Sequence, residues 1–323
     1  MHTNYFMSVV LVSTLFLAGP AHSNGVAFVT DVKGEAALDA SKASLMAEVK
    51  RGARISCLKE CAVGVMYLIS GKEYVLKGPG DFLVGDSEVT AKIGPPPTMR
   101  ETNWKVSSKV VAQAAQTSSA SIRMRSLGAA QKTDSMPLLA ERLIYPRDTA
   151  VATLQPSFRW ASANLKGPFE FELKTSMGAK SVYKAKSNMT SLALPKNIQL
   201  QPDAEYSWMV KAAGGEVGMT SFRTLPIHSL DLTQKRKPDE KAQFSDWLLY
   251  ALTLKDVGAD QDAGEVWVKL VKDRPDLPEL AALAKYWAGR EHGVITEGKM
   301  FSAFMIHGLV MSYIQPVAVC IAR

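Results

Sequence analysis

A chain of 323 residues is long enough for two or three domains, and its 47% of hydrophobic residues can supply ordinary cores. The formal net charge of +7 is modest, and no dense run of Lys and Arg with interleaved aromatic residues accompanies it. We therefore expect no nucleic-acid partner, whereas an anionic surface such as a cell envelope would suit a diffuse basic charge.

Residues 1–23 have the pattern of a cleavable export signal. Phe6 to Ala18 form an apolar stretch of 13 residues, and Ala21-His22-Ser23 places small residues just before a cut at Asn24. No Cys follows these small residues, so we expect no lipid anchor there. We predict a periplasmic protein; because the first residues lack Lys and Arg, an uncleaved anchor or a buried segment is the alternative.

Cys57 and Cys61 form a C-x-x-x-C pair that we place on the adjoining ends of two strands. In an oxidising compartment they would close a disulfide loop of about five residues, which reduced chain entropy makes worth about 2 kcal/mol. Free thiols are the main alternative. A metal site would need further ligands, and the histidines stand singly, so we predict no metal and no cofactor.

The pattern of residues 24–102 predicts a module of β-hairpins. Val63 to Ile69 form a continuous apolar strand, and Ser70-Gly71-Lys72 makes a tight turn into the strand from Tyr74 to Leu76. Gly94-Pro-Pro-Pro97 ends the sheet, because proline donates no hydrogen bond to a β-ladder.

This module resembles the FecR-type periplasmic domain in three stretches, which are Lys50 to Ile55, the strand–Gly71–strand unit, and Lys77 to Val84. The resemblance implies a short β-rich domain in the bacterial envelope. The chain departs from the family at the Cys57–Cys61 loop, where a plain strand connection is expected. It also lacks the cytoplasmic helix and internal membrane span of the iron-signalling regulators, so the resemblance does not imply their control of a sigma factor.

Residues 103–142 are rich in Ser, Ala, Gln, Thr and Lys, and we predict a flexible linker with one transient helix from Lys105 to Gln116. Val110, Val111 and Ile122 are too scattered for a core. The linker is either a solvated spacer or a contact for an anionic cell-wall glycan or lipid. Its basic residues are Lys105, Lys109, Arg123, Arg125 and Lys132.

Residues 143–226 contain about seven short alternating strands, which predict a β-sandwich. In the stretch from Leu200 to Ala212 a turn is followed by Tyr206, Trp208 and Val210, which point to one face. This stretch resembles the penultimate strand of a fibronectin type III or immunoglobulin-like domain. The resemblance implies that Tyr206 makes the corner hydrogen bond of that family.

Trp160 and Trp208 could form an aromatic platform for a sugar. Tryptophans in such a strand pattern are more often core residues, so we assign both, with Tyr206, to the core of the sandwich.

Glu170 and Glu172 share one face of a strand about 7 Å apart, a spacing that suits paired carboxylates in acid–base hydrolysis. The alternating residues Phe169, Phe171 and Leu173 must take the core face. Both Glu side chains are therefore expected to face solvent, where they can be neutralised by Lys174, Lys184 or Lys186.

After the sandwich the apolar period changes from two to 3.6, which predicts helices within residues 227–299. Two apolar faces contain Trp247 and Trp267, which we assign to the core, and Gly258 is placed to end the first helix.

The stretch from Tyr250 to Pro275 resembles a single tetratricopeptide-type repeat, and Pro278 to Gly289 would form a third helix. Asp260 or Asp262 can cap the second helix at its N-terminus. One repeat cannot form the usual peptide groove, so we expect these helices to dock against the sandwich.

Residues 300–323 end the chain with an uncharged stretch from Met300 to Ala322, which is 23 residues long and sufficient to cross a bilayer. Arg323 would then face the cytoplasm, leaving the rest of the chain outside the inner membrane. The alternatives are a buried terminal helix and a non-native extension of the gene model.

The sequence contains no G-x-S-x-G, H-E-x-x-H, Walker or dinucleotide-binding motif. We therefore expect a mainly β, multidomain, non-enzymatic protein, exported to the envelope as a binding, scaffold or sensor-accessory protein with an unidentified envelope protein as its partner. The first alternative is a cell-wall-associated protein that binds peptidoglycan or polysaccharide through its basic middle region. A hydrolase of unrecognised type is the second.

Overall fold

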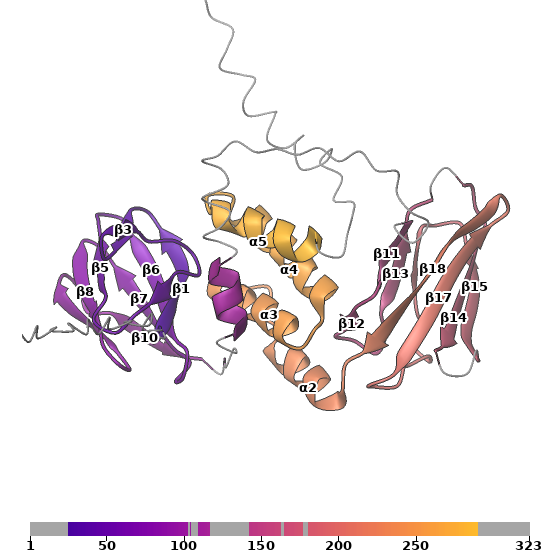
Figure 1. Cartoon of the computed structure of the whole chain (residues 1–323), viewed down its shortest axis with the longest axis horizontal. Coiled ribbons are helices and arrows are strands. Elements are labelled where there is room, and N and C mark those ends of the chain that lie inside the picture. Colours follow the sequence, from indigo (N-terminus) through magenta and orange to yellow (C-terminus); the bar gives the residue numbers. More distant parts are fainter. Residues whose placement is uncertain are drawn as a thin grey trace, which may run out of the picture.

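The computed structural model of the chain describes residues 25–102, 104, 109–116, 142–162, 165–176 and 180–289. These residues form four β-sheets and a set of helices, which confirms the mainly β fold class. Two β modules lie at the ends of the long axis, and the helices lie between them (Figure 1). The predicted export signal and the apolar segment 300–323 lie outside the described residues.

The N-terminal module consists of two five-stranded antiparallel sheets, with strand orders β10-β7-β6-β1-β4 and β3-β2-β5-β8-β9. Phe28 and Val65 from the first sheet and Ile55 and Phe82 from the second are fully buried. The strands are β1 (Ala27–Lys33), β2 (Ala36–Leu38), β3 (Ser41–Lys42), β4 (Glu48–Val49), β5 (Arg54–Cys57), β6 (Ala62–Tyr67), β7 (Lys72–Lys77), β8 (Gly80–Val84), β9 (Val89–Ile93) and β10 (Thr98–Glu101).

The second module is a sandwich of a three-stranded sheet, β11-β13-β16, and a five-stranded sheet, β12-β18-β17-β14-β15. All its strand pairs are antiparallel except β12 with β18. Its core is aromatic, because Phe158, Trp160, Phe171 and Trp208 contact one another between the sheets. The strands are β11 (Leu143–Tyr145), β12 (Ala150–Val151), β13 (Ser157–Trp160), β14 (Phe169–Thr175), β15 (Ser181–Ser187), β16 (Ser191–Ala193), β17 (Glu205–Ala212) and β18 (Gly215–Thr224).

Four helices follow the sandwich: α2 (Ile227–Arg236), α3 (Phe244–Asp256), α4 (Asp260–Asp273) and α5 (Pro278–Gly289). Gly258 ends α3 as its position predicts. Its φ is +82°, and the amides of Gly258 and Ala259 donate to the carbonyls of Lys255 and Leu254, the pattern of a Schellman motif.

The predicted cap of α4 is wrong, because Ala259 is the N-cap residue and no side chain caps the helix. Asp260 and Asp262 lie inside the first turn instead. The Asp262 carboxylate accepts hydrogen bonds from the sandwich, and not from the backbone amides at the start of α4.

The helices share a continuous hydrophobic core with the N-terminal module, whereas the sandwich has a core of its own. Helix α3 is buried on nearly all sides, with Leu248, Leu249, Leu252 and Leu254 inaccessible to solvent. The predicted docking of the helices against the sandwich is therefore only part of the arrangement, because they also complete the core of the first module.

Residues 109–116 form a helix within the stretch where the sequence predicts one, but the expected flexible linker needs a correction there, because this helix is packed into the shared core. Val110, Val111 and Ala114 lie on one helical face and are buried there. Trp104 is buried too, and the guanidinium carbon of Arg236 lies 5.5 Å from the centre of its ring. Three apolar residues are enough to bury this helix, because they pack against the apolar surface that the N-terminal module and the other helices provide.

Within the described residues, no helix has both the length and the apolar character needed to cross a membrane.

Candidate functional site

The predicted disulfide between Cys57 and Cys61 is confirmed. It joins the end of β5 to the residue before β6, and both cysteines are buried. Gly78 packs on the loop so closely that a Cβ there would lie 1.9 Å from the carbonyl oxygen of Leu58. The loop is thus held from outside as well as by its bond, which suits a structural staple rather than a reactive thiol site.

The residues predicted for the core of the sandwich are buried, with Trp160, Tyr206 and Trp208 each exposing 3% or less. The two tryptophans therefore offer no ring face to a sugar. The Tyr206 hydroxyl accepts a hydrogen bond of 2.9 Å from the amide of Gln201, and the Trp208 indole donates to the carbonyl of Pro146 at 2.7 Å.

The two tryptophans predicted for the helical core differ. Trp267 is inaccessible to solvent, whereas Trp247 is only partly buried and packs against the edge of the core. The ammonium of Lys269 lies 4.5 Å from the centre of the Trp247 ring, a cation–π contact.

The Glu170 and Glu172 carboxylates lie on the outer face of the five-stranded sheet, as expected. Lys186 pairs with Glu170 at 2.9 Å, and Lys184 pairs with Glu172 at 3.1 Å. Hydrogen bonds from these lysines hold the pKa of both carboxyls below the usual value. A general acid needs a raised pKa, and the shift of both carboxyls is in the opposite direction.

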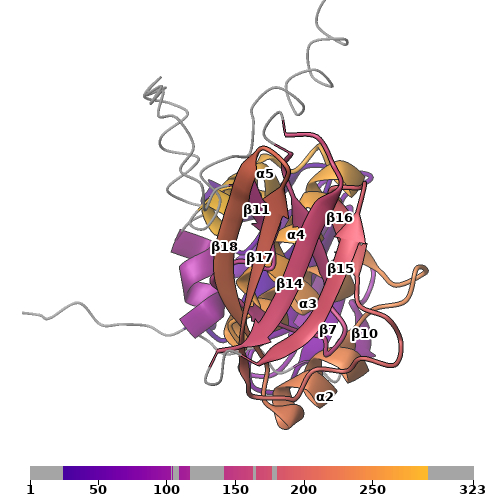
Figure 2. The same ribbon diagram turned by 90° about the vertical axis from the view of Figure 1, so that its right-hand side faces the viewer.

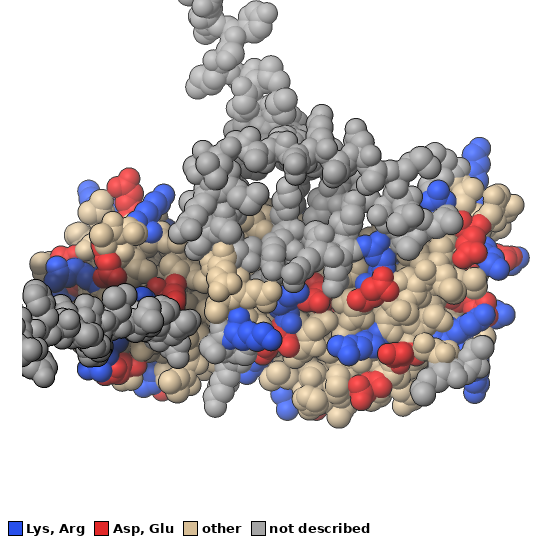
Figure 3. Space-filling model, in the orientation of Figure 1, with Lys and Arg blue, Asp and Glu red and all other residues tan. Residues whose placement is uncertain are grey.

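The described residues contain no group of three or more His, Cys, Asp or Glu side chains able to hold a metal. Of the five basic residues predicted to contact glycan, only Lys109 is described, and it is exposed. On the face shown in Figure 3, acidic and basic side chains of the described residues are interspersed without a large patch of one sign.

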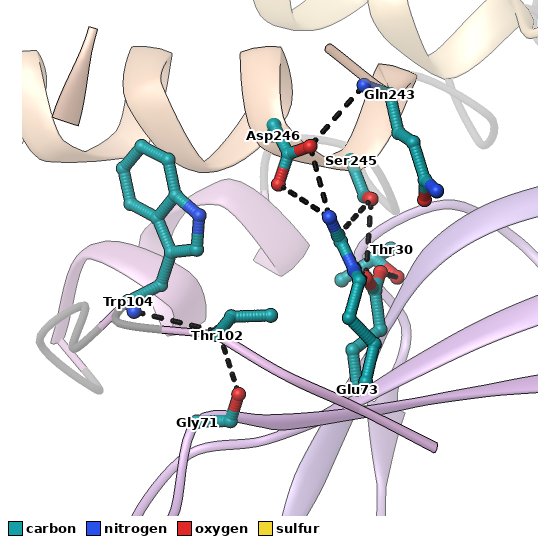
Figure 4. A network of polar contacts seen from close by, with 9 residues as sticks. Thr30, Gly71, Glu73, Thr102, Trp104, Gln243, Ser245 and Asp246 are labelled. Carbon is teal, nitrogen blue, oxygen red and sulfur yellow. Dashed lines mark hydrogen bonds and ion pairs between the residues drawn. The ribbon is translucent and has the colours of Figure 1, made fainter. Parts of the chain in front are cut away.

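The most elaborate polar arrangement joins the N-terminal module to α3 (Figure 4). At its centre is Glu73 on β7, whose side chain is only 2% exposed. One Glu73 oxygen accepts from the Thr30 hydroxyl at 2.7 Å, and the other accepts from Arg100 Nε at 3.1 Å and the Ser245 hydroxyl at 3.2 Å. A buried carboxylate is stable only with such partners, so the network fixes the position of every element that supplies one.

Arg100 on β10 connects Glu73 to the first turn of α3. Its Nη1 donates to both Asp246 oxygens at 2.9 Å, and its Nη2 donates to the Ser245 hydroxyl at 3.0 Å. Asp246 also accepts from the amide of Gln243, which precedes the helix. One carboxylate thus stabilises the helix N-terminus and binds the N-terminal module at once.

A second contact lies at the same open end of the helical hairpin, where the guanidinium carbon of Arg274 lies 5.1 Å from the ring centre of Phe244, the first residue of α3. Arg274, just after α4, pairs with Asp31 and donates to the carbonyl of Val32 at 2.7 Å. Both residues belong to β1, so the ends of α3 and α4 are each bound to the first sheet.

The joint between the sandwich and α4 is polar and centres on Asp262. Its two oxygens accept from the Tyr145 hydroxyl at 2.6 Å and from the amide of Ala152 at 2.7 Å. Gln261 beside it accepts from the amide of Arg147 at 2.8 Å and donates to the carbonyl of Ile144 at 3.1 Å. Burial raises the pKa of Asp262 to about 6, although these hydrogen bonds act in the opposite direction.

The sequence predicted that the helices dock against the sandwich, but it predicted neither of these two polar networks. Glu73 is a charged residue directly before the apolar run Tyr74 to Leu76 of β7, and this is the one signal that points to the first network. Asp is a common helix-capping residue, so the sequence suggested a cap at Asp262 and not a contact with the sandwich.

No known protein-family model matches the chain, and no curated protein matches it. Its function must therefore be argued from its own geometry.

Proposed function

We propose that the chain is a non-enzymatic, exported binding or scaffold protein of the bacterial envelope that acts through protein–protein recognition. One observation carries this proposal: the helical layer fixes two β modules at opposite ends of the molecule (Figure 1). A body of this kind presents two separate recognition surfaces at a set distance, as a scaffold requires.

The module resemblances add to the proposal. The hairpins of residues 24–102 suit a FecR-like domain, and the disulfide suits an oxidising compartment such as the periplasm. The Tyr206 hydrogen bond is that of a tyrosine corner, which favours a fibronectin- or immunoglobulin-like sandwich. The tetratricopeptide-like hairpin acts as a spacer, because α3 is covered and presents no groove.

The test is site-specific photo-crosslinking of the full chain in the periplasm. A crosslinking amino acid is placed at the exposed Ile93 of the N-terminal module, at the exposed Met219 of the sandwich, and, as a matched control, at the exposed Val268 in the middle of the molecule. The proposal expects a specific protein captured at Ile93 or Met219 and not at Val268. Capture of no specific protein at either end would contradict it.

Sedimentation with purified sacculi over a salt series distinguishes the cell-wall alternative. Binding that disappears at moderate salt reflects charge alone, whereas retention at high salt, together with no captured protein, would favour glycan binding.

A further inference from the structure

Strand β15 forms a free edge of the sandwich. It pairs with β14 on one side and ends the five-stranded sheet, as Figure 2 shows from the face of that sheet. No described residue pairs with its other side. A seven-residue edge of this kind presents a row of backbone N–H and C=O groups with which another extended chain can pair.

The outer face of the sheet carries charges that alternate from strand to strand. Lys186 on β15 lies opposite Glu170 on β14, which lies opposite Lys211 on β17, which lies opposite Glu216 on β18. At the next position along β15, Lys184 lies opposite Glu172.

The edge column is therefore positive. The side chains of Lys184 and Lys186 are 67% and 71% exposed, although each also reaches a Glu of β14. A further strand that continues the alternation would place acidic residues opposite these two lysines.

The inner face of β15 is apolar. Tyr183 is half-buried against the sandwich core, with its ring 6.3 Å from that of Phe171, and Ala185 is half-buried opposite Phe171. Exposed Met189 follows the end of the strand. The inward residues of an added strand would thus rest on apolar surface.

We propose that the edge of β15 binds an extended segment of a partner protein in which acidic residues alternate with apolar ones. The segment adds to the sheet as a sixth strand, with its acidic residues facing Lys184 and Lys186 and its apolar residues facing Tyr183. This inference rests on the proposed function, because it names the surface and the class of partner for the sandwich end.

A second copy of this chain does not fit the same edge. In antiparallel pairing of two β15 strands, the register that overlaps the whole strand places Lys184 opposite itself, and a shift of two residues places it opposite Lys186 or opposite Val182. Like charges directly opposite one another destabilise a strand pair, so the lysines oppose self-association and favour an acidic strand.

The probe is a labelled peptide with the sequence of Phe169–Thr175, because β14 already shows the proposed pattern against β15. A second peptide carries Lys in place of the two Glu residues. Fluorescence anisotropy with the full chain should show tighter binding of the acidic peptide, and hydrogen exchange should slow in residues 181–187. Equal affinity for the two peptides, or slowed exchange confined to other strands, would overturn the inference.

Three variants locate the effect. Lys184→Gln with Lys186→Gln should weaken binding of the acidic peptide roughly two- to thirtyfold, the range expected for two cross-strand charge pairs. Lys211→Gln, on the same face but two strands from the edge, is the matched control and should leave binding unchanged. Lys184→Glu with Lys186→Glu should reverse the preference toward the Lys peptide, and an unaltered preference would contradict the model.

The outcomes separate this inference from the proposed function. A protein captured at Met219 whose binding is indifferent to the Lys184→Gln, Lys186→Gln change would overturn the edge site and leave the scaffold function standing. If sedimentation shows a dimer, and hydrogen exchange in residues 181–187 slows when it forms, the assignment of an acidic partner would be overturned.

Discussion

Arg100 is the residue on which the contact between the N-terminal module and α3 depends most. Its guanidinium neutralises Glu73, whose buried carboxylate water could not solvate in its place. It also binds Asp246 at the start of the helix. The carboxylate at the centre makes the arrangement asymmetric: losing the partially exposed arginine leaves a fully buried charge without a counterion.

We predict that Arg100→Ala lowers the free energy of unfolding by about 3 kcal/mol, the lower end of the range for breaking a buried ion pair, since Arg100 itself is partly exposed. Urea denaturation followed by tryptophan fluorescence measures the change. Arg51→Ala is the matched control, because Arg51 forms an exposed pair with Asp86 and should cost about 0.5 kcal/mol or less. Equal decreases in the free energy of unfolding of the two variants would show that the buried network stabilises the fold no more than an exposed ion pair does.

The disulfide makes a smaller contribution. Replacing Cys57 and Cys61 with Ser should destabilise the N-terminal module by about 2 kcal/mol, because the closed loop is short. Denaturation of this variant and of the dithiothreitol-reduced protein should agree. Full folding stability in both would show that the packing of Gly78 and its neighbours alone holds the loop.

At the scale of elements, the joint between α4 and the sandwich should respond to pH. The Asp262 carboxyl has a pKa of about 6 in the folded protein, above its ordinary value near 4 when unfolded. The folded state therefore binds more protons in this window. The stabilisation that comes from protonated Asp262 is complete below about pH 4, decreases as the pH rises toward 6, and is lost above that.

Asp262→Asn should accordingly flatten the pH dependence of the melting temperature between about pH 4 and 6. Asp273→Asn, at the exposed end of the same helix, is the control and should leave the slope as in the wild type. A slope in the Asp262→Asn protein identical to that of the wild type would contradict the assignment.

The elements also show what a sequence can and cannot predict. The helix end at Gly258, the disulfide and the hydrogen bond between Gln201 and Tyr206 were all predictable, because each depends on residues within a few positions. Arg100 meets Asp246 across 146 residues, and no period or spacing reports a contact so distant. The burial of residues 109–116 was missed for the same reason, since its partner surface comes from elsewhere in the chain.

For the whole molecule, the two cores predict different behaviour of fragments. Residues 142–226 contain the buried residues of the sandwich core. When this fragment is expressed alone, we expect cooperative unfolding and little binding of a hydrophobic dye. Residues 25–102 lose the helices that complete their core, so we expect dye binding and a broad or absent unfolding transition. Circular dichroism and dye fluorescence compare the two, and a well-folded N-terminal fragment would show that the shared core is dispensable.

The shared core also sets the order in which a newly made chain can finish folding. Asp31 and Arg274 pair across 243 residues, and contacts over such a separation form late. Strand β1 emerges early, while α3, which packs against it, is made only after the whole sandwich. In that interval the apolar side of β1 lacks the helix that covers it in the folded protein, and the sandwich between them is free to fold first.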